Sequence, residues 1–445
     1  MPSKPLEFEP HLPPFMPAEL PGFYWDEARN RYFPLSSRPK PPQPPPVAVS
    51  KRRNPTPESQ SSENGLSRKR KRVYDPWDVN ESRRSACSNS MRLRNSHEIL
   101  CSQYASTSRM TPTRVHPIGS ITAFCMTKVG GHDWQFIGDD RGWLYSERKH
   151  LPNEPPRFNL HSTINLQASS TISSICVSGS YCVASCFGAA RLSVQDLNIA
   201  ERTYLMTFNT VVDIRSSHLQ QKGLVLGTSK RIIYIPDIDV ATNFRSLRTN
   251  SDVFSVIQRD HLIYAGLRNG TLERYDTRVP DPKSVKLFEG RFEKSGRSPL
   301  LHINVLRENE LLLSHMNADL STFDLRFSPT SSTVTPIQVF EGHVNSYRPD
   351  LGIAVDQEHD LLFAAGADNR IRGWSLRTGV PFSPPPPTPC LPDQPSNPFT
   401  HTFPSQVCAL QVTEEGGKSG TCLWASCDKD LYQFHLGQRG AMEND

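Results

Sequence analysis

Three segments in the second half of the chain align without gaps, and this internal repeat is the feature that most constrains the fold. They read GLRNGTLERYDTR (266–278), SHMNADLSTFDLR (314–326) and AGADNRIRGWSLR (365–377). Each places an Asx residue at a tight turn, an apolar residue three positions later and an aromatic residue three further on. The Asx side chain can close the turn through hydrogen bonds to its local backbone. A polar turn followed by a short apolar strand, repeated along the chain, predicts an all-β fold built from equivalent units.

Looser copies of the same unit occur on both sides of these three segments. Each joins a strand-like apolar run to a polar turn and a second strand, as in GLVLGTSKRIIYIPD (223–237). The units start near residues 120, 172, 210, 253, 301, 344 and 406. The chain is therefore predicted to contain seven β units that bury their apolar faces against one another.

One unit, at 341–376, resembles the repeat of the WD-repeat family. It has a Gly-His pair that ends at His343, Asp368 in the turn, and Trp374 followed by Ser where the family has Asp. The resemblance implies an all-β fold, a seven-bladed β-propeller with four antiparallel strands in each blade. In this family the His, the turn Asp and the Trp form a structural hydrogen-bond network. The resemblance therefore assigns His343, Asp368 and Trp374 to stability and not to catalysis.

The ends of the repeat region predict how the ring closes. In WD propellers each repeat supplies three inner strands of one blade and the outer strand of its neighbour. Here the last predicted strand ends near Leu436. We therefore expect TPTRVHPI (111–118) to supply the outer strand of the seventh blade, so that the propeller spans 111–445. Within it, 380–404 is too rich in proline to pair as a strand and is predicted to be an exposed insertion.

The region before the repeats has a different composition. Residues 1–77 hold 17 of the 39 prolines. We therefore expect 1–18 to be disordered and 36–77 to be an extended, basic linker. Residues 1–118 carry a net charge of +8 and the remainder −3, so the basic character belongs to this region.

A run of five basic residues lies inside the linker. It consists of Arg68, Lys69, Arg70, Lys71 and Arg72. Together with a second basic cluster upstream, it resembles a nuclear-import signal and predicts a nuclear protein, with the cytoplasm as a second location. The alternatives are a solvated tail without a specific role, or non-specific attraction to nucleic acid.

The sequence contains no set of residues typical of a catalytic or cofactor site. GLVLGTSK (223–230) lacks the residue order of a phosphate-binding loop, and zincin, nucleophile-elbow and dinucleotide motifs are absent. The ten cysteines include no Cys-x-x-Cys pair, so a zinc site is not expected. Without a long apolar run, the chain is predicted to be soluble and intracellular, with no membrane segment. We expect a protein that is not an enzyme and needs no cofactor or metal.

An Arg follows the aromatic residue at the same distance in each of the three best-aligned units. The first two units carry Asp276 with Arg278 and Asp324 with Arg326, and the third carries Arg377 after a Ser. One interpretation is local: each Arg pairs with its own acid, and exposed pairs of this kind contribute little stability. The other is a basic track along one rim of the propeller that anchors a partner.

The same spacing is similar to the W-D-x-R box of substrate receptors in cullin-4 RING ubiquitin ligases. The resemblance implies that the two Asp and three Arg residues just named form an adaptor-binding rim. The adaptor of these ligases is the large subunit of the damaged-DNA-binding protein. Two further stretches, ELPGFYWDEARNRYFPL (19–35) and EGHVNSY (341–347), resemble the fourth cullin-4-associated factor group, also called the WD repeat protein 21 type.

The segments before the propeller are the other candidates for partner binding. In 19–35 two aromatic clusters flank a polar turn, which predicts a β-hairpin; they comprise Phe23, Tyr24, Trp25, Tyr32 and Phe33. Since an isolated hairpin is marginal in water, we expect it to fold against a partner or the propeller. The best helix candidate is 78–105, and in similar receptors such a helix docks into the adaptor; plain disorder is the alternative.

Two functions are consistent with these features. The first is a non-catalytic substrate receptor, monomeric within a cullin-4 RING ligase complex. It would bind the adaptor through 78–105 and the arginine rim, and recruit an unknown target protein through the propeller. The second is a nuclear WD-repeat scaffold in chromatin or RNA-processing complexes. Binding to the ligase adaptor separates the two.

Overall fold

A computed structural model describes a propeller with one long helix, and separately a small hairpin. The described residues are 23–26, 31–34, 76–113, 115–148, 161–199, 202–240, 243–280, 282–289, 298–326, 335–385, 397–415 and 420–439. They fall into two compact units, Met1–Tyr74 and Asp75–Asp445. The segment predicted to be disordered (1–18), the basic run from Arg68 to Arg72 and nearly all of the linker lie outside the described residues.

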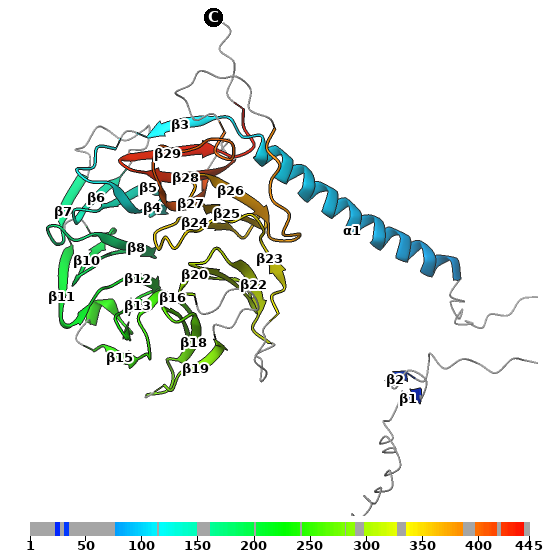
Figure 1. Cartoon of the computed structure of the whole chain (residues 1–445), viewed down its shortest axis with the longest axis horizontal. Coiled ribbons are helices and arrows are strands. Elements are labelled where there is room, and N and C mark those ends of the chain that lie inside the picture. The colour runs from blue at the N-terminus through cyan, green and yellow to red at the C-terminus, as the bar shows by residue number, and fades with distance from the viewer. Residues whose placement is uncertain are drawn as a thin grey trace, which may run out of the picture. The chain divides into compact units, whose positions relative to one another are not determined.

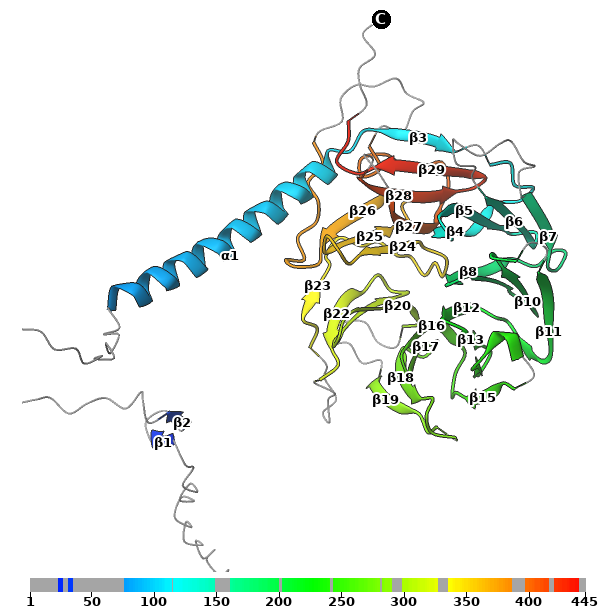
Figure 2. The ribbon, with the colours of Figure 1, turned by 180° about the vertical axis from the view of Figure 1, so that it is seen from behind.

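The second unit contains seven antiparallel sheets arranged in a ring, which confirms the predicted seven-bladed propeller (Figures 1 and 2). Blade 1 consists of β4 (Ile121–Val129), β5 (His132–Asp139), β6 (Trp143–Arg148) and β7 (His161–Asn165). Blade 2 consists of β8 (Ile172–Ser178), β9 (Tyr181–Cys186), β10 (Ala189–Asp196) and β11 (Thr203–Val212). Blade 3 consists of β12 (Ser216–Gln220), β13 (Gly223–Thr228), β14 (Arg231–Ile235) and β15 (Arg245–Arg248), with the 3-10 helix η2 (Ile238–Val240) between the last two strands.

The remaining blades follow in chain order, except for one strand. Blade 4 consists of β16 (Val253–Arg259), β17 (Leu262–Leu267), β18 (Thr271–Asp276) and β19 (Val285–Glu289). Blade 5 consists of β20 (Leu300–Arg307), β21 (Glu310–His315), β22 (Leu320–Asp324) and β23 (Gln338–Val339). Blade 6 consists of β24 (Ile353–Asp356), β25 (Leu361–Ala365) and β26 (Ile371–Ser375). Blade 7 consists of β27 (Val407–Glu415), β28 (Gly420–Cys427), β29 (Asp430–His435) and β3 (Met110–Thr113).

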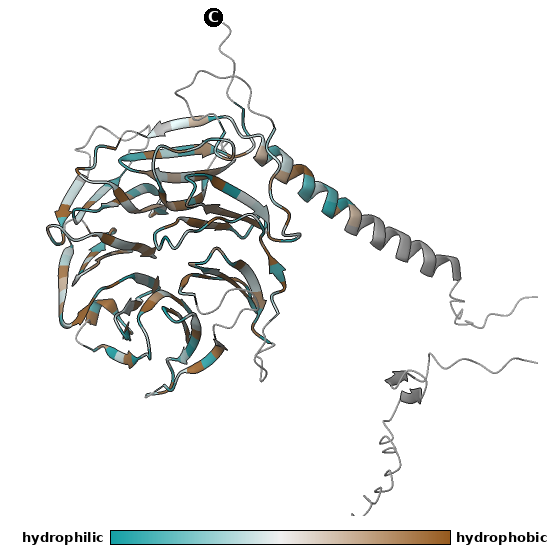
Figure 3. Cartoon of the chain, in the orientation of Figure 1, coloured by the Kyte–Doolittle hydropathy of each residue, from teal (hydrophilic) through white to brown (hydrophobic). Residues whose placement is uncertain are grey.

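The apolar core lies between neighbouring blades. The second strands YCVASC (β9), GLVLGT (β13) and LLFAA (β25) are buried at every residue, because each is covered on both faces. One core cluster joins Leu272 and Phe288 of blade 4 to Leu300 and Leu313 of blade 5. Apolar residues, shown in brown in Figure 3, therefore occur on strands throughout the ring. Each blade needs its neighbours to remove its apolar faces from water, as the seven-unit repeat predicted.

The ring closes through a strand from before the first blade. β3 pairs antiparallel with β29, with Met110 opposite Phe434 and Thr113 opposite Leu431. This confirms that the segment ahead of the propeller completes the seventh blade, although the strand begins one residue earlier than the predicted segment 111–118. The Thr111 hydroxyl also lies 2.6 Å from Nε2 of His435, which strengthens the closure.

Blade 6 differs from the others because the proline-rich insertion follows its third strand. Instead of a fourth strand, Pro381 forms one isolated bridge with Trp374, and the Phe382 amide donates to Gly373 O at 2.7 Å. The ends of 380–404 are not the exposed loop that we expected, since Phe382 and Phe399 pack against a core cluster. Proline cannot donate to a ladder, but the aromatic residues beside it still gain from burial. Residues 386–396 lie outside the described residues.

The helix α1 (Pro76–Ala105) covers the segment 78–105, for which a marginal helix that orders on binding and plain disorder were the two alternatives. Side chains are described for 91–105, and in this part His97 and Tyr104 are buried against the propeller. The helix runs away from the ring at its N-terminal end (Figures 1 and 2). Because β3 begins five residues after α1 ends, the closing strand and the helix are fixed together.

The first unit contains an antiparallel hairpin at the predicted position. β1 (Phe23–Asp26) pairs with β2 (Arg31–Pro34), with Tyr24 opposite Phe33 and Trp25 opposite Tyr32. All five aromatic residues of the predicted motif therefore lie on the two strands. The docking of the hairpin on a partner or on the propeller stays a prediction.

Candidate functional site

The three arginine-bearing loops lie on one face of the ring. Each follows the third strand of its blade, and its backbone bonds to the turn between the first two strands. The amides of Thr277, Leu325 and Leu376 donate to the carbonyls of His261, Asn309 and Asp360, each at 2.8 Å. We call this face, formed by the loops at 276–278, 324–326 and 375–378 and the turns beside them, the loop rim.

Two of the three arginines pair with the acid of their own loop. Arg278 contacts Asp276 through Nε–Oδ1 at 3.0 Å and Nη2–Oδ2 at 2.6 Å. Arg326 repeats both distances with Asp324. The hydrogen bonds from Arg278 lower the pKa of Asp276 to about 2. The local interpretation is thus correct for these two pairs, yet both arginine side chains remain about two-thirds exposed on the loop rim, at 66% and 67%.

Arg377 is not equivalent to the other two. Its Nε bonds Oδ2 of Asp360 at 2.6 Å, since position 375 is a Ser and offers no carboxylate. Asp360 also accepts from Nη2 of Arg307 in blade 5, at 2.9 Å. Burial raises the pKa of Asp360, but the bonds from Arg377 and Arg307 outweigh it and lower the pKa overall. Asp360 therefore links blades 5 and 6 across the loop rim, which the sequence did not reveal.

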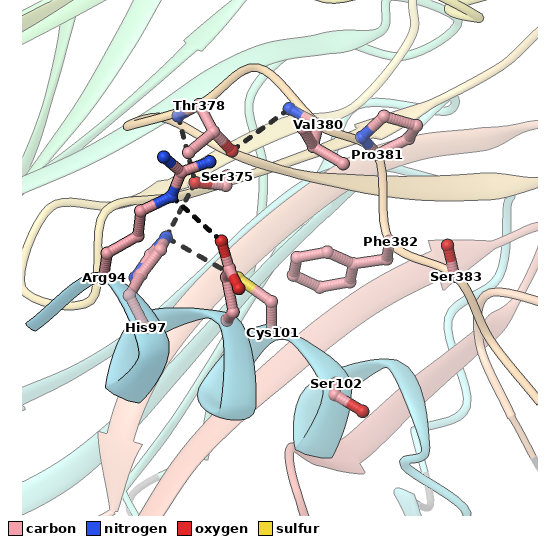
Figure 4. Close-up of a pocket in the computed structure, with 11 residues that line it drawn as sticks. Arg94, His97, Cys101, Ser102, Ser375, Thr378, Val380, Pro381, Phe382 and Ser383 are labelled. Atoms are coloured by element: carbon pink, nitrogen blue, oxygen red, sulfur yellow. Dashed lines mark hydrogen bonds and ion pairs between the residues drawn. The ribbon is translucent and has the colours of Figure 1, made fainter. Parts of the chain in front are cut away.

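The Ser that replaces the motif Asp anchors α1. Ser375 Oγ lies 2.7 Å from Nε2 of His97, whose side chain is only 7% exposed (Figure 4). The same oxygen accepts from the amides of Arg377 and Thr378, at 3.2 and 3.3 Å. Its proton is then available for donation to a neutral His97. Burial, aided by Arg377, lowers the pKa of His97 and favours this neutral form.

Further contacts hold the last turn of α1 on the same face. The Tyr104 hydroxyl donates to Thr421 Oγ1 at 3.2 Å, and its ring centre lies 5.9 Å from that of His359 in the β24–β25 turn. The Asn397 side chain donates to Ala105 O at 2.9 Å and caps the helix end. Sequence reasoning missed these anchors. The one available signal was a Ser at a position where the other units carry Asp.

A cavity of about 280 Å³ lies between α1 and the start of the proline-rich segment (Figure 4). Phe382 and Val380 form one wall, and Cys101 of the helix forms the other. Arg94 and Glu98 line it as well and form an ion pair at 3.1 Å on the exposed side of the helix. Burial raises the pKa of the Cys101 thiol to about 11, so it stays protonated and acts as an apolar wall.

The free part of α1 carries exposed apolar side chains. These are Met91, Leu93 and Ile99, which are 63%, 65% and 59% exposed. They lie on different sides of the helix that leaves the loop rim, so exposed apolar side chains stand next to a charged rim. Apolar residues surrounded by polar ones are typical of protein-binding surfaces.

The residues assigned to the structural network lie close together but do not form one chain of side-chain bonds. The Trp374 indole donates to the carbonyl of Glu341 at 2.9 Å, and its ring centre lies 6.4 Å from that of His343. Asp368 pairs with Arg372 at 2.6 Å. Nδ1 of His343 is buried without a hydrogen-bond partner among the described residues. Trp374 and His343 are buried, as a structural role requires.

The part of the chain that the structure describes holds no cluster of three or more His, Cys, Asp or Glu side chains suited to a metal ion. None of its helices has the length and hydropathy needed to cross a membrane.

Comparison with known proteins agrees with the fold and with the motifs. No family model matches the chain. WD repeat-containing protein 21 from Schizosaccharomyces pombe (strain 972 / ATCC 24843) is 25% identical over 163 residues, which cover 36% of this chain and 37% of that protein. DDB1- and CUL4-associated factor 4 from Homo sapiens is 30% identical over 158 residues (34% and 28%), and that from Bos taurus 31% over 163 residues (34% and 29%).

These matches cover little more than a third of each curated relative at most. They show a resemblance, but they do not show that the chain has the activity of the whole relative. Among solved structures, the WD40 β-propeller domain of Doa1 superposes with a TM-score of 0.52 at 12% identity, over 74% of this chain and 96% of that domain. The chain folds as a seven-bladed β-propeller like that of a WD40 domain and resembles WD repeat-containing protein 21 and DDB1- and CUL4-associated factor 4.

Proposed function

We propose that the chain is a non-catalytic substrate receptor of a cullin-4 RING ubiquitin ligase and acts in the nucleus. The names of the relatives support the choice of ligase, since they describe association with DDB1 and CUL4. The propeller supplies a rigid surface for protein partners, and the chemistry of ubiquitin transfer belongs to other subunits. The proposal keeps the adaptor-binding rim that the resemblance to cullin-4 substrate receptors implied.

The observation that carries the proposal is that α1 and the arginine loops lie on the same face. The contact between His97 and Ser375 fixes the helix end within the loop that also holds Arg377. A partner that surrounds the exposed part of the helix therefore also contacts the loop rim. The apolar side chains Met91, Leu93 and Ile99 supply apolar burial, and the rim supplies oriented charge.

The ion pairs on the rim do not prevent partner binding. Arg278 uses Nε and Nη2 for Asp276, and its side chain is still 66% exposed, so its remaining N–H groups face solvent. The carboxylate fixes the plane of the guanidinium, so less side-chain entropy is lost when a partner binds. Arg326 and Asp324 repeat the arrangement one blade further along.

Co-purification of the adaptor with the tagged full-length chain tests the proposal. We expect wild type to recover the adaptor and the double variant Arg278→Ala/Arg326→Ala to recover about 30-fold less, if each arginine contributes about 1 kcal/mol and the two together about 2 kcal/mol. The matched control is Arg268→Ala. It removes an arginine of equal exposure (67%) that pairs with Asp252 on the opposite face of the ring.

Two results would contradict the proposal. Equal recovery by the double variant and by Arg268→Ala would remove the rim from the interface. Absence of the adaptor from wild-type eluates would exclude the receptor function and leave the scaffold in chromatin or RNA-processing complexes. For the nucleus, replacing the five basic residues at 68–72 with Ala should shift a fluorescently tagged chain to the cytoplasm, and an unchanged distribution would refute the import signal.

A further inference from the structure

An arginine at the centre of the ring makes contacts unlike those of the rim arginines. The Arg215 guanidinium carbon lies 4.8 Å from the ring centre of Phe187 and 4.7 Å from that of Phe254. The three residues come from blades 2, 3 and 4, so residues of three neighbouring blades together form this cation–π cluster. Stacking on aromatic faces orients the guanidinium plane and leaves its N–H edge available to a ligand.

This cluster lies on the face opposite the loop rim. Phe187 is in the turn between β9 and β10, Arg215 directly precedes β12, and Phe254 is the second residue of β16. These positions are at the ends of the strands remote from the loops that carry Arg278 and Arg326. The first strands of the blades, among them β12 and β16, lie toward the middle of the ring (Figure 1), so Arg215 and Phe254 belong to its inner part.

The charge of Arg215 has no partner in the part of the chain that the structure describes. Its Nε is buried without a hydrogen bond, and no carboxylate of the described residues lies within ion-pair distance. Arg278, Arg326 and Arg377 all have such partners. A guanidinium partly removed from water without a counter-ion is costly, and this cost is recovered when an anion binds.

Asp350 is a charged neighbour that Arg215 does not pair with. The residue as a whole is exposed, but its carboxyl group is partly removed from water, which raises its pKa, and Arg215 only partly opposes this effect. Asp350 comes from the loop before β24 in blade 6, on the same face as Arg215. It therefore acts on an incoming anion as a like charge and not as a ligand.

We propose that Arg215, with Phe187 and Phe254, forms an oxyanion-binding site that receives a carboxylate side chain from an extended, acidic segment of a partner protein. The guanidinium edge offers two parallel N–H donors to the carboxylate, and the two rings pack against the apolar part of the same segment. The inference builds on the proposed function, in which α1 and the loop rim bind the adaptor and the opposite face of the ring is free to bind the target protein.

Fluorescence polarisation with the purified full-length chain and a labelled oligoglutamate peptide tests the site. We expect binding of oligoglutamate but not of oligoglutamine, and at least about tenfold weaker binding by Arg215→Ala. Asp350→Asn should tighten binding, since it removes a like charge. Arg268→Ala, which removes an ion-paired arginine from the same face, should leave the affinity unchanged.

Further measurements keep the proposal falsifiable if Arg215→Ala is unstable. The double variant Phe187→Leu/Phe254→Leu retains the charge and should still weaken binding, because the guanidinium loses its aromatic support. Equal affinity of wild type and Arg215→Ala, with matching melting curves, would overturn the site. Tighter binding of a phosphoserine peptide than of oligoglutamate would assign the site to phosphate. If single-stranded DNA displaced oligoglutamate as well as unlabelled oligoglutamate does, the binding would be non-specific attraction between opposite charges and not a peptide site.

The test separates this inference from the proposed function. Peptide binding is measured without the adaptor, and adaptor recovery is measured for Arg215→Ala as well. Loss of peptide binding with full adaptor recovery is the expected outcome for this variant. Arg215-dependent binding by a chain that recovers no adaptor would uphold the site and refute the receptor function.

Discussion

Replacing Ser375 with Ala should release the end of α1 from the propeller without unfolding the ring. The change removes the hydroxyl that lies 2.7 Å from Nε2 of His97 and leaves that buried nitrogen with Cys101 Sγ at 3.6 Å as its neighbour. It also removes the acceptor for the amides of Arg377 and Thr378. The two amides belong to an exposed Arg377 and a half-buried Thr378, so they can turn to water.

The free-energy cost of Ser375→Ala comes mainly from leaving Nε2 of His97 buried without its hydrogen-bond partner. A buried polar group that loses its partner costs about 1–3 kcal/mol, whereas the two loop amides recover most of their loss in water. A cost of this size raises the equilibrium population of the detached helix end by about 5- to 150-fold. Tyr104 and Asn397 still hold Ala105 and its neighbours, so we expect local opening and not global unfolding.

Hydrogen–deuterium exchange of the amides at 98–105 measures this opening directly. Exchange in Ser375→Ala should be faster there and unchanged in the buried strands β9, β13 and β25. Ser102→Ala is the matched control, since it truncates an exposed Ser that lines the same cavity. The double variant with His97→Ala should show a coupling of about 1 kcal/mol. Equal exchange in Ser375→Ala and Ser102→Ala, or faster exchange across all blades, would refute the reasoning.

Two further predictions concern the stability of the ring. Burial lowers the pKa of three histidines from 6.5 to about 4: His302, His315 and His343. Between these pH values the unfolded chain binds more protons, so the free energy of unfolding should fall as the pH falls from 6.5 to 4, by up to about 3 kcal/mol for each histidine. Chemical unfolding at pH 7, 6 and 5 measures this, and a flat profile would contradict it. Gly142→Ala should cost about 3 kcal/mol or more, because the new Cβ would clash with Gln167 O at φ +84°. Gly131→Ala, at φ +83° with nothing within 4 Å, should cost only about 1 kcal/mol, and equal melting temperatures of the two variants would exclude the clash.

Local patterns were enough to predict the blades because each unit carries its own turn and strand signals. The unit starts near 120, 172 and 253 agree with β4, β8 and β16 to within a residue. The closing strand was predicted from the resemblance to WD repeats, in which each repeat supplies the outer strand of a neighbouring blade, so that the seventh blade needs a strand from another segment. The unit start near 344 was less accurate, because the Gly-His motif used to place it is followed by a loop and β24 begins only at Ile353.

The contacts of the candidate sites depend on residues that are far apart in the sequence. Nothing near Arg377 indicates that its partner is Asp360, and nothing near His97 indicates Ser375, 278 positions away. The contacts of Arg215 with two phenylalanines require the relative placement of three blades. Repeat alignment identifies equivalent positions, but a substitution such as Asp to Ser has meaning only when its spatial neighbour is known.

The closing strand also sets the order in which the protein can be completed during synthesis. Thr111 and His435, which meet in the seventh blade, are 324 positions apart. At roughly 5–20 residues per second, about 15–65 s pass between the synthesis of β3 and that of β29. During this interval β3 has no strand to pair with, and α1 has no completed rim to dock on. The helix that we propose as the adaptor-binding element therefore docks only after most of the ring has been made, because its anchors Ser375 and Thr421 belong to blades 6 and 7.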